Sequence, residues 1–159
     1  VGSEMCIRDR MITEAREAGK NFLLIMSDLN GLKYVNDSFG HSEGDNLINT
    51  AAGLLSCTRI SGASCEKNFR IGGDEFVKAA YGDITQQGID EFRREISEKV
   101  NITNSTSCKP YPIYMPIGTC LRSPGDIPDC DKMLSSADEA MYADKIRLKS
   151  VTGFDPKRK

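Results

Sequence analysis

The pattern that most constrains the fold lies near the middle of the chain. Residues 68–71 and 76–81 have the composition of short strands, and Gly72-Gly73-Asp74-Glu75 stands between them. Two adjacent glycines between strands favour a hairpin, because tight turns need positive φ angles that glycine adopts without steric cost. The sequence therefore predicts two antiparallel strands joined by a turn that carries two carboxylates.

The other elements follow from the spacing of apolar residues. The continuous apolar run Phe22–Met26 predicts a strand over residues 22–27 that is buried on both faces, in the centre of a sheet. A further strand is expected over residues 113–121, bent at Pro116. Helices are expected over residues 11–20, with Gly19 as the stop signal, and over residues 32–39, 85–100 and 131–149. A further long helix is expected after a turn at residues 40–45, and a loop over residues 101–112.

This order of elements favours one architecture. Strand, two helices, hairpin, helix, strand and helix predict a ferredoxin-like (palm-type) α/β sandwich. A central, mostly antiparallel sheet would be flanked by helices. The hairpin tip would then lie at the rim of the sheet, beside the end of the first strand, so that rim is the expected active site.

Composition excludes several classes of protein. The 159 residues suit one domain, and a net charge of −2 offers no broad basic face for nucleic acid. No apolar run is long enough to span a membrane, and we expect no membrane contact by this domain. The six cysteines contain no Cys-x-x-Cys pair and there is one histidine, so a zinc site is not expected. Reduced thiols and a cytoplasmic location are expected.

The sequence of the first ten residues indicates that they do not belong to the native protein. Val-Gly-Ser-Glu-Met-Cys-Ile-Arg-Asp-Arg back-translates to GTG GGC TCG GAG ATG TGT ATA AGA GAC AGx, which matches a transposon adapter used in sequencing libraries. We therefore treat residues 1–10 as an adapter artefact, residues 11–150 as an N-terminally truncated domain, and residues 151–159 as a C-terminal tail. The alternative is a genuine, flexible N-terminus.

Three carboxylates are expected to converge at one rim of the sheet. Asp28 follows the buried strand, and Asp74 and Glu75 stand on the hairpin turn. Carboxylates that are brought together repel one another unless a cation neutralises them. Mg²⁺ suits such a site, because it binds one or two carboxylates and completes its octahedron with phosphates and water. The alternative is that Asp28 starts a turn while Asp74 and Glu75 only solvate the hairpin.

Phosphate-binding groups follow Asp28 in the sequence. Asn30-Gly31-Leu32-Lys33 opens a helix, where free amides favour anions and Gly31 permits close approach. Lys33 adds a positive charge, and Lys145 and Lys149 lie one turn apart on the last helix. The alternative for these two lysines is a solvated face near a helix C-terminus. The sequence contains no P-loop.

Asn36 and Asp45 are candidates for reading a guanine base. A carboxylate can accept hydrogen bonds from guanine N1–H and N2–H₂, and an amide can meet N2–H, N3 or O6. Adenine would leave the Asp45 carboxylate unpaired, so the pair would select guanine. The alternative is that both residues are helix caps.

Four ordered motifs carry a family resemblance. They are Asp28-Leu-Asn-Gly-Leu-Lys33-Tyr-Val-Asn36-Asp37, Gly40-His41-x-x-Gly44-Asp45, Arg70-Ile-Gly72-Gly73-Asp74-Glu75-Phe76 and Ala137-Asp138-Glu-Ala-Met-Tyr142-Ala-Asp-Lys145. Together they resemble the GGDEF-domain family of diguanylate cyclases over roughly residues 11–149.

The resemblance implies an activity. It implies a bacterial signal-transduction enzyme, a nucleotidyltransferase that condenses two GTP molecules to cyclic di-GMP and releases pyrophosphate. It also implies Mg²⁺ or Mn²⁺ as cofactor and an antiparallel homodimer, because each domain holds one GTP. An upstream sensor, missing from this chain, would be the usual partner and could anchor the native protein to a membrane.

The resemblance also implies roles residue by residue. Asp28 and Asp74 would hold the metals, with the Leu29 carbonyl as a further ligand. Glu75 would assist metal binding or activate the 3′-hydroxyl group. The substrate-binding residues would be Asn36 and Asp45 for guanine, Gly31, Leu32 and Lys33 for phosphates, Lys145 and Lys149 for the triphosphate, and Gly72 and Gly73 in the turn.

Three departures from the family pattern matter. Ala63-Ser64-Cys65-Glu66 stands where the family has an inhibitory Arg-x-x-Asp, so feedback inhibition there is not expected. Lys149 replaces the family's usual arginine, which weakens bidentate binding. The family's opening Asp-x-Leu-Thr-Gly-Leu-x-Asn-Arg segment is absent, in line with a truncated chain.

Other functions remain open at this point. A catalytically inactive receptor for GTP or a cyclic dinucleotide would keep the fold, but it would be expected to lose some of the acidic and amide residues that are present here. A purely structural dimerisation module would leave the convergence of carboxylates unexplained. A related cyclase that uses ATP conflicts with an acid at position 45.

Overall fold

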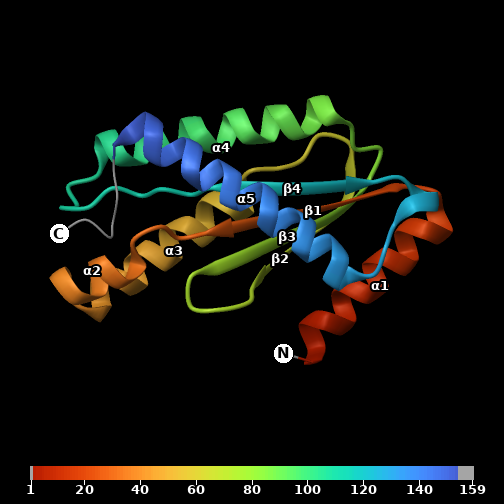
Figure 1. Ribbon diagram of the computed structural model, residues 1–159, viewed down its shortest axis with the longest axis horizontal. Helices are drawn as coiled ribbons and strands as arrows, with labels where there is room; N and C mark the ends of the chain where they lie inside the picture. The colour runs from red at the N-terminus through yellow and green to blue at the C-terminus, as the bar shows by residue number, and fades with distance from the viewer. Residues whose placement is uncertain (1, 154–159) are drawn as a thin grey trace.

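The computed structural model describes residues 2–153 and shows one sheet with helices on both faces (Figure 1). The elements run in the order α1 (Gly2–Ala18), β1 (Asn21–Asp28), α2 (Leu32–Phe39), α3 (His41–Cys57), β2 (Ala63–Arg70), β3 (Glu75–Gly82), α4 (Gln86–Thr106), β4 (Ile117–Arg122), the 3₁₀ turn η1 (Pro124–Asp126) and α5 (Cys130–Thr152). Within this range, none of the helices has the length and apolarity that a bilayer span requires.

The sheet confirms the expected ferredoxin-like architecture. Its four strands lie in the order β2-β3-β1-β4, and each neighbouring pair is antiparallel. The first strand is central, as its apolar run predicts. Because β1 and β3 are adjacent and antiparallel, the end of β1 lies beside the start of β3, where the hairpin turn ends.

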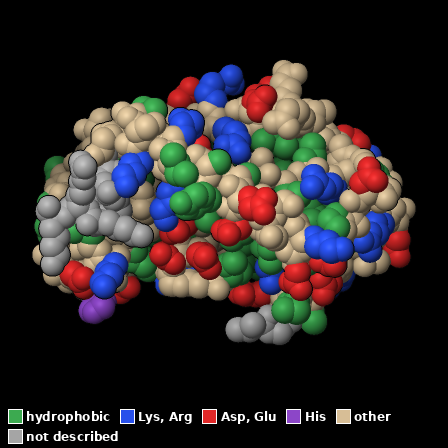
Figure 2. All heavy atoms as spheres, viewed as in Figure 1, with side chains coloured by type: hydrophobic (Ala, Val, Ile, Leu, Met, Phe, Trp, Pro, Cys, Tyr) green, Lys and Arg blue, Asp and Glu red, His purple; other side chains and the backbone are tan. Residues whose placement is uncertain are grey.

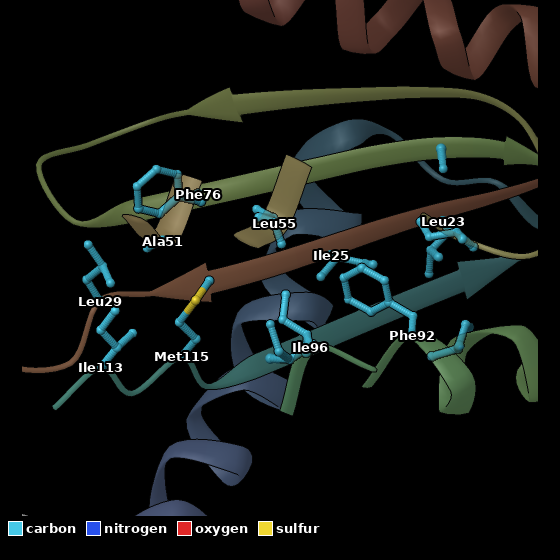
Figure 3. Close-up of a cluster of buried hydrophobic side chains, with 14 of the residues drawn as sticks. Leu23, Ile25, Leu29, Ala51, Leu55, Phe76, Phe92, Ile96, Ile113 and Met115 are labelled. Carbon is cyan, nitrogen blue, oxygen red and sulfur yellow. The ribbon is translucent and has the colours of Figure 1, made fainter. Parts of the chain in front are cut away.

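Two cores, one on each face, hold the sheet. Alternate residues of β1 enter different cores, with Leu23 and Ile25 on one face and Phe22 and Leu24 on the other. Figure 3 shows the first core, in which side chains of β1 meet Phe92 and other residues of α3 and α4. The second core lies under α1 and α5. A strand buried on both faces has its register fixed, since a shift of one residue would exchange the two faces.

The boundaries differ from the sequence expectations in several places, and β2 in particular starts at Ala63, whereas the expected strand starts at residue 68. Helix α4 continues to Thr106, through residues assigned to a loop, because Thr103 and Thr106 hydrogen-bond to carbonyls four residues earlier and Asn104 pairs with both backbone groups of Ile113. Strand β4 starts only at Ile117, so the extended segment before it is not part of the sheet. The turn expected over residues 40–45 is confined to Gly40, because α3 starts at His41.

Helix α1 runs through the segment that the sequence assigns to a sequencing adapter. It ends at Ala18, and Gly19 adopts a φ of 63°, which agrees with the expected stop at that glycine. Met11, Ile12 and Ala15 are buried in the second core. The adapter origin of residues 1–10 stays a prediction from the sequence.

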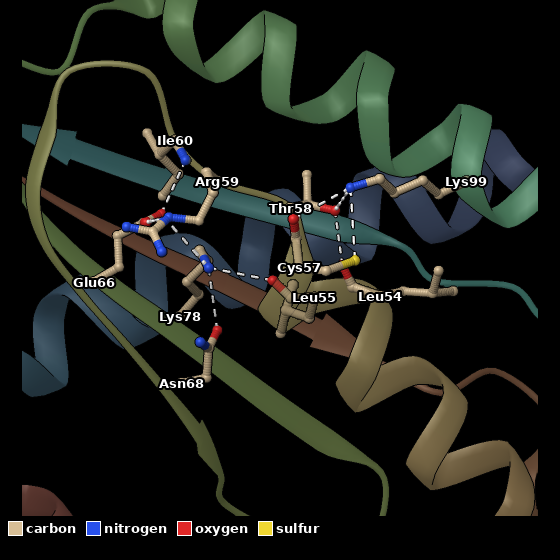
Figure 4. Close-up of polar contacts among 10 residues, drawn as sticks. All are labelled: Leu54, Leu55, Cys57, Thr58, Arg59, Ile60, Glu66, Asn68, Lys78 and Lys99. Atoms are coloured by element: carbon tan, nitrogen blue, oxygen red, sulfur yellow. Dashed lines mark hydrogen bonds and ion pairs between the residues drawn. The ribbon is translucent and has the colours of Figure 1, made fainter.

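A buried ion pair lies between β2, β3 and the end of α3 (Figure 4). Lys78 is 1% exposed, and its Nζ lies 3.6 Å from Glu66 Oε1 and 3.2 Å from the Leu55 carbonyl oxygen. Glu66 also accepts from the Ile60 amide and pairs with Arg59. Burial lowers the pKa of Lys78, and the Glu66 carboxylate opposes that shift. The Glu66 carboxylate is therefore fully engaged by groups of the protein itself.

We expect Glu66→Leu to destabilise the protein by about 3 kcal/mol, because it leaves the Lys78 ammonium buried without a counter-charge. Lys78→Met combined with Glu66→Leu should recover most of that loss, since an apolar pair replaces the ion pair. Chemical denaturation of the two variants measures both values. A double variant that is less stable than Glu66→Leu alone would contradict this account.

Candidate active site

Strand pairing brings the three predicted carboxylates to one rim of the sheet. Asp28, the last residue of β1, lies directly opposite Glu75, the first residue of β3. The pairing continues one step further, where the Leu29 amide donates to the Asp74 carbonyl oxygen at 2.8 Å. The hairpin turn is thereby tied to the end of β1, and Asp28, Asp74 and Glu75 lie close enough for their charges to interact.

The electrostatics of the rim show an excess of negative charge. Burial raises the pKa of Asp28; a hydrogen bond and the charge of Lys145 lower it, and Asp74 raises it further. Burial also raises the pKa of Glu75, as do the negative charges of Asp74, Asp28 and Asp138. The Lys145 Nζ lies 3.1 Å from Asp28 Oδ2 and is the cation that compensates part of this repulsion.

The rim opens into a hollow of about 390 Å³. It is lined by Asp28, Glu75, Asp138, Glu139, Met141, Tyr142 and Lys145. Figure 2 shows Asp and Glu side chains gathered beside the middle of α5 on the viewed face. The hollow is thus bounded by two strand ends and one helix, and acidic groups dominate its walls.

The oxygen atoms at the rim suit a divalent cation that takes its remaining ligands from phosphate and water. No group of three histidine, cysteine or acidic side chains within residues 2–153 is arranged to hold a metal ion by itself. Asp28, Asp74 and the Leu29 carbonyl offer hard oxygen atoms, which Mg²⁺ prefers, and two carboxylates are as many as it commonly takes from a protein. The residues present therefore fit Mg²⁺ or Mn²⁺ with phosphate and water as the remaining ligands.

The turn of the hairpin corrects one element of the sequence reasoning. Neither Gly72 nor Gly73 has a positive φ, although the hairpin itself is present. A Cβ on Gly72 would lie 3.1 Å from Glu75 Oε2, so glycine leaves room for that carboxylate. The Arg70 guanidinium donates to the carbonyl oxygens of Gly72 and Gly73 and folds the turn back on β2.

The predicted phosphate-binding residues are placed along two helices. Gly31 adopts a φ of 93° at the start of α2, and no side chain caps that helix end. Leu32 and Lys33 form its first turn, and Lys33 is exposed. On α5, Lys145 reaches Asp28, whereas Lys149 is exposed one turn later and does not line the hollow. The structure brings Lys145 to the carboxylates and leaves Lys33 and Lys149 at the surface.

The predicted guanine-reading residues lie together where α2 meets α3. A Cβ on Gly44 would lie 1.7 Å from Asn36 Oδ1, so the Asn36 side chain rests against the backbone next to Asp45. Asp45 is exposed within α3. It is not a cap, because Gly40 is the N-cap of α3. Asn36 contributes only its backbone carbonyl oxygen to the end of α2, where that oxygen accepts a hydrogen bond from the Gly40 amide.

Sequence reasoning missed part of the hollow. Asp138, Glu139 and Tyr142 line it with Lys145, but only Lys145 was expected to contact substrate. The spacing of Asp138, Tyr142 and Lys145 on α5 places them on one helix face, which could have indicated a shared role.

Comparison with known proteins agrees with the fold and the motifs. Signaling protein YkoW of Bacillus subtilis (strain 168) is 34% identical over 140 residues, which are 82% of this chain and 16% of YkoW. Diguanylate cyclase DgcS of Shewanella oneidensis is 25% identical over 145 residues, which are 91% of this chain and 46% of DgcS. The chain therefore spans less than half the length of these two relatives.

Solved structures and a family model give the same assignment. The GGDEF domain of DgcB from Caulobacter crescentus, crystallised in complex with c-di-GMP, has a TM-score of 0.74 and 27% identity, with 89% of this chain and 81% of that chain covered. The family model described as "Diguanylate cyclase, GGDEF domain" matches residues 7–150. This chain belongs to the GGDEF-domain family of diguanylate cyclases.

Proposed function

We propose that this chain is a diguanylate cyclase domain, which condenses two GTP molecules to cyclic di-GMP in an antiparallel homodimer. The observation that carries the proposal is the convergence of Asp28, Asp74 and Glu75 with Lys145 at the rim of the sheet. Each 3′-hydroxyl group attacks the α-phosphorus of the opposite GTP, and each attack breaks the bond to pyrophosphate. Two phosphodiester bonds form and two pyrophosphates leave.

The residues at the rim divide the work of this reaction. Asp28, Asp74 and the Leu29 carbonyl would hold Mg²⁺ or Mn²⁺. The bound metal supplies positive charge for the α-phosphate and the leaving pyrophosphate. Glu75 is suited to accept the proton of the 3′-hydroxyl group, because its carboxylate lines the hollow directly opposite Asp28.

The helices that border the rim would bind the nucleotide. The first amides of α2 and the Lys33 ammonium favour phosphate oxygens, and Lys145 and Lys149 add positive charge for the triphosphate. Asp45 would accept from guanine N1–H and N2–H₂, with the Asn36 amide beside it. One domain provides half of the reacting atoms, so two copies must face one another.

The context of the domain is part of the same proposal. An upstream sensor would bring two copies together in the cytoplasm. Because Ala63 replaces an arginine and Glu66 is buried, the product would not inhibit the enzyme through that segment.

Product analysis with GTP and Mg²⁺ tests the proposal. The chain, fused to a coiled coil that dimerises it, should form cyclic di-GMP and pyrophosphate, which chromatography separates. GTP binding without turnover in a proven dimer would instead support a catalytically inactive GTP or cyclic dinucleotide receptor. Absence of both binding and turnover would exclude both functions.

Asp74→Ala is expected to lower turnover at least about a hundredfold, because it removes a carboxylate that holds the cation opposite the developing charge. The measurement is the steady-state rate of pyrophosphate release. Glu98→Ala, which removes an exposed acid on α4, should leave the rate unchanged. A fully active Asp74→Ala protein would remove Asp74 from the metal site.

Asp45→Ser is expected to relax the choice of base, because the serine leaves no carboxylate unpaired against adenine. The ratio of kcat/KM for GTP to that for ATP should fall about a hundredfold. Asp90→Ser, an exposed acid on α4, serves as the control. Strict use of GTP by Asp45→Ser would place guanine recognition elsewhere.

Glu75→Gln should stabilise the ligand-free protein at pH 7 by about 2 °C in Tm, because it removes a carboxylate that its neighbours repel. The folded pKa of Glu75 is raised, so its favourable contribution exists below its ordinary pKa of 4.5 and is lost as pH rises through the folded value. Thermal unfolding from pH 4 to pH 7 should show the advantage of the variant growing with pH. An advantage that shrinks would reverse the assigned sign.

A further inference from the structure

Helix α5 packs tightly against the sheet at one glycine. A Cβ on Gly118 of β4 would lie 1.9 Å from the Ala137 carbonyl oxygen and 2.3 Å from the Met141 amide nitrogen. Figure 1 shows α5 crossing β4 and β1 on this face. This approach sets the distance between helix and sheet, and Met133, Ala137 and Met141 turn one face of α5 into the second core.

Asp144 adds a polar contact between α5 and β4, beyond the last of these buried side chains. Its Oδ2 accepts a hydrogen bond of 2.8 Å from the Ile117 amide, and its Oδ1 accepts from Arg147 Nε at 2.8 Å. The Asp144 side chain is 10% exposed, so the bond to β4 is shielded from water. A charged acceptor in a poorly solvated place makes a stronger hydrogen bond than a neutral, exposed one.

The two residues of this hydrogen bond, Asp144 on α5 and Ile117 on β4, both lie close to the pair formed by Lys145 and Asp28. Ile117 pairs with Ser27, the residue before Asp28, and Lys145 follows Asp144. Successive helix residues point about 100° apart, since a turn contains 3.6 residues. With Asp144 held at Ile117, the Lys145 side chain extends over the end of β1, where its Nζ lies 3.1 Å from Asp28 Oδ2.

We propose that Asp144 is a positioning residue for the triphosphate site: its hydrogen bond to the Ile117 amide anchors the part of α5 beyond the core and holds Lys145 at the end of β1. The inference rests on the proposed function, in which Lys145 binds the triphosphate of GTP. Asp144 itself contacts neither nucleotide nor metal and acts through Lys145.

The same backbone residue provides a matched control. Arg93 of α4 donates to the Ile117 carbonyl oxygen at 3.1 Å, so Ile117 is held by α5 through its amide and by α4 through its carbonyl. Both contacts stabilise the edge of the sheet, but only the Asp144 contact fixes the helix that carries Lys145. A merely structural role would make the two contacts equivalent.

Asp144→Ala should weaken GTP binding about tenfold and raise KM with little change in kcat, which is the effect of losing one charge-assisted hydrogen bond. Asp144→Asn should restore binding to within about twofold, because its amide oxygen can accept from the same N–H. Arg93→Met should lower Tm while leaving GTP affinity within about twofold. Isothermal titration and steady-state kinetics measure these values in the full chain.

A double-mutant cycle tests whether Asp144 acts through Lys145. In a Lys145→Met background, Asp144→Ala should cause no further loss of GTP affinity. Losses that multiply, or wild-type affinity in Asp144→Ala alone, would overturn the proposal.

Hydrogen exchange separates failure of this inference from failure of the proposed function. The Ile117 amide of the nucleotide-free protein should exchange faster in Asp144→Ala than in the wild type or in Asp144→Asn. Unchanged exchange would show that the anchor is absent, whatever the activity. Rapid exchange together with a wild-type protein that binds no GTP would instead refute the proposed function.

Discussion

The register of β1 against β3 is the constraint on which the site depends. It places Asp28 opposite Glu75 and lets the Leu29 amide bind the Asp74 carbonyl oxygen. Both strands are buried on both faces, so a shift of one residue would exchange the side chains that enter the two cores and spoil the packing of both. Burial of apolar side chains therefore holds together carboxylates that would otherwise separate.

Two lysine–carboxylate pairs in this fold differ in what surrounds them. The Glu66 carboxylate accepts a hydrogen bond from the Ile60 amide and forms ion pairs with Arg59 and Lys78. Asp28 forms an ion pair with Lys145 and otherwise lies beside other negative charges and an open hollow. The charge of Glu66 is neutralised by groups of the protein, and the pair stabilises the interior. The charges around Asp28 are only partly neutralised by Lys145, which is the property expected of a site that binds a cation and phosphate.

Local patterns were enough to predict much of this structure. The apolar run of β1, the helix over residues 32–39 and the hairpin were all expected, because each depends on neighbouring residues. The last turns of α4 were missed because Asn104 is held by Ile113, a contact that spacing cannot reveal. The contribution of Asp138 to the hollow likewise depends on how α5 crosses the sheet. The glycine turn was expected for the wrong reason, since neither Gly72 nor Gly73 has a positive φ and the turn is held by hydrogen bonds from the Ile71 amide and the Arg70 guanidinium.

The two side chains that hold Ile117 also affect how copies of the protein can associate. β4 is an edge strand, and an open edge presents backbone groups that another strand can pair with. At Ile117, Asp144 occupies the amide and Arg93 occupies the carbonyl, so neither group is available to a foreign strand. Extension of the sheet by a foreign strand is thus hindered at this end of β4, close to the rim that carries Asp28 and Glu75.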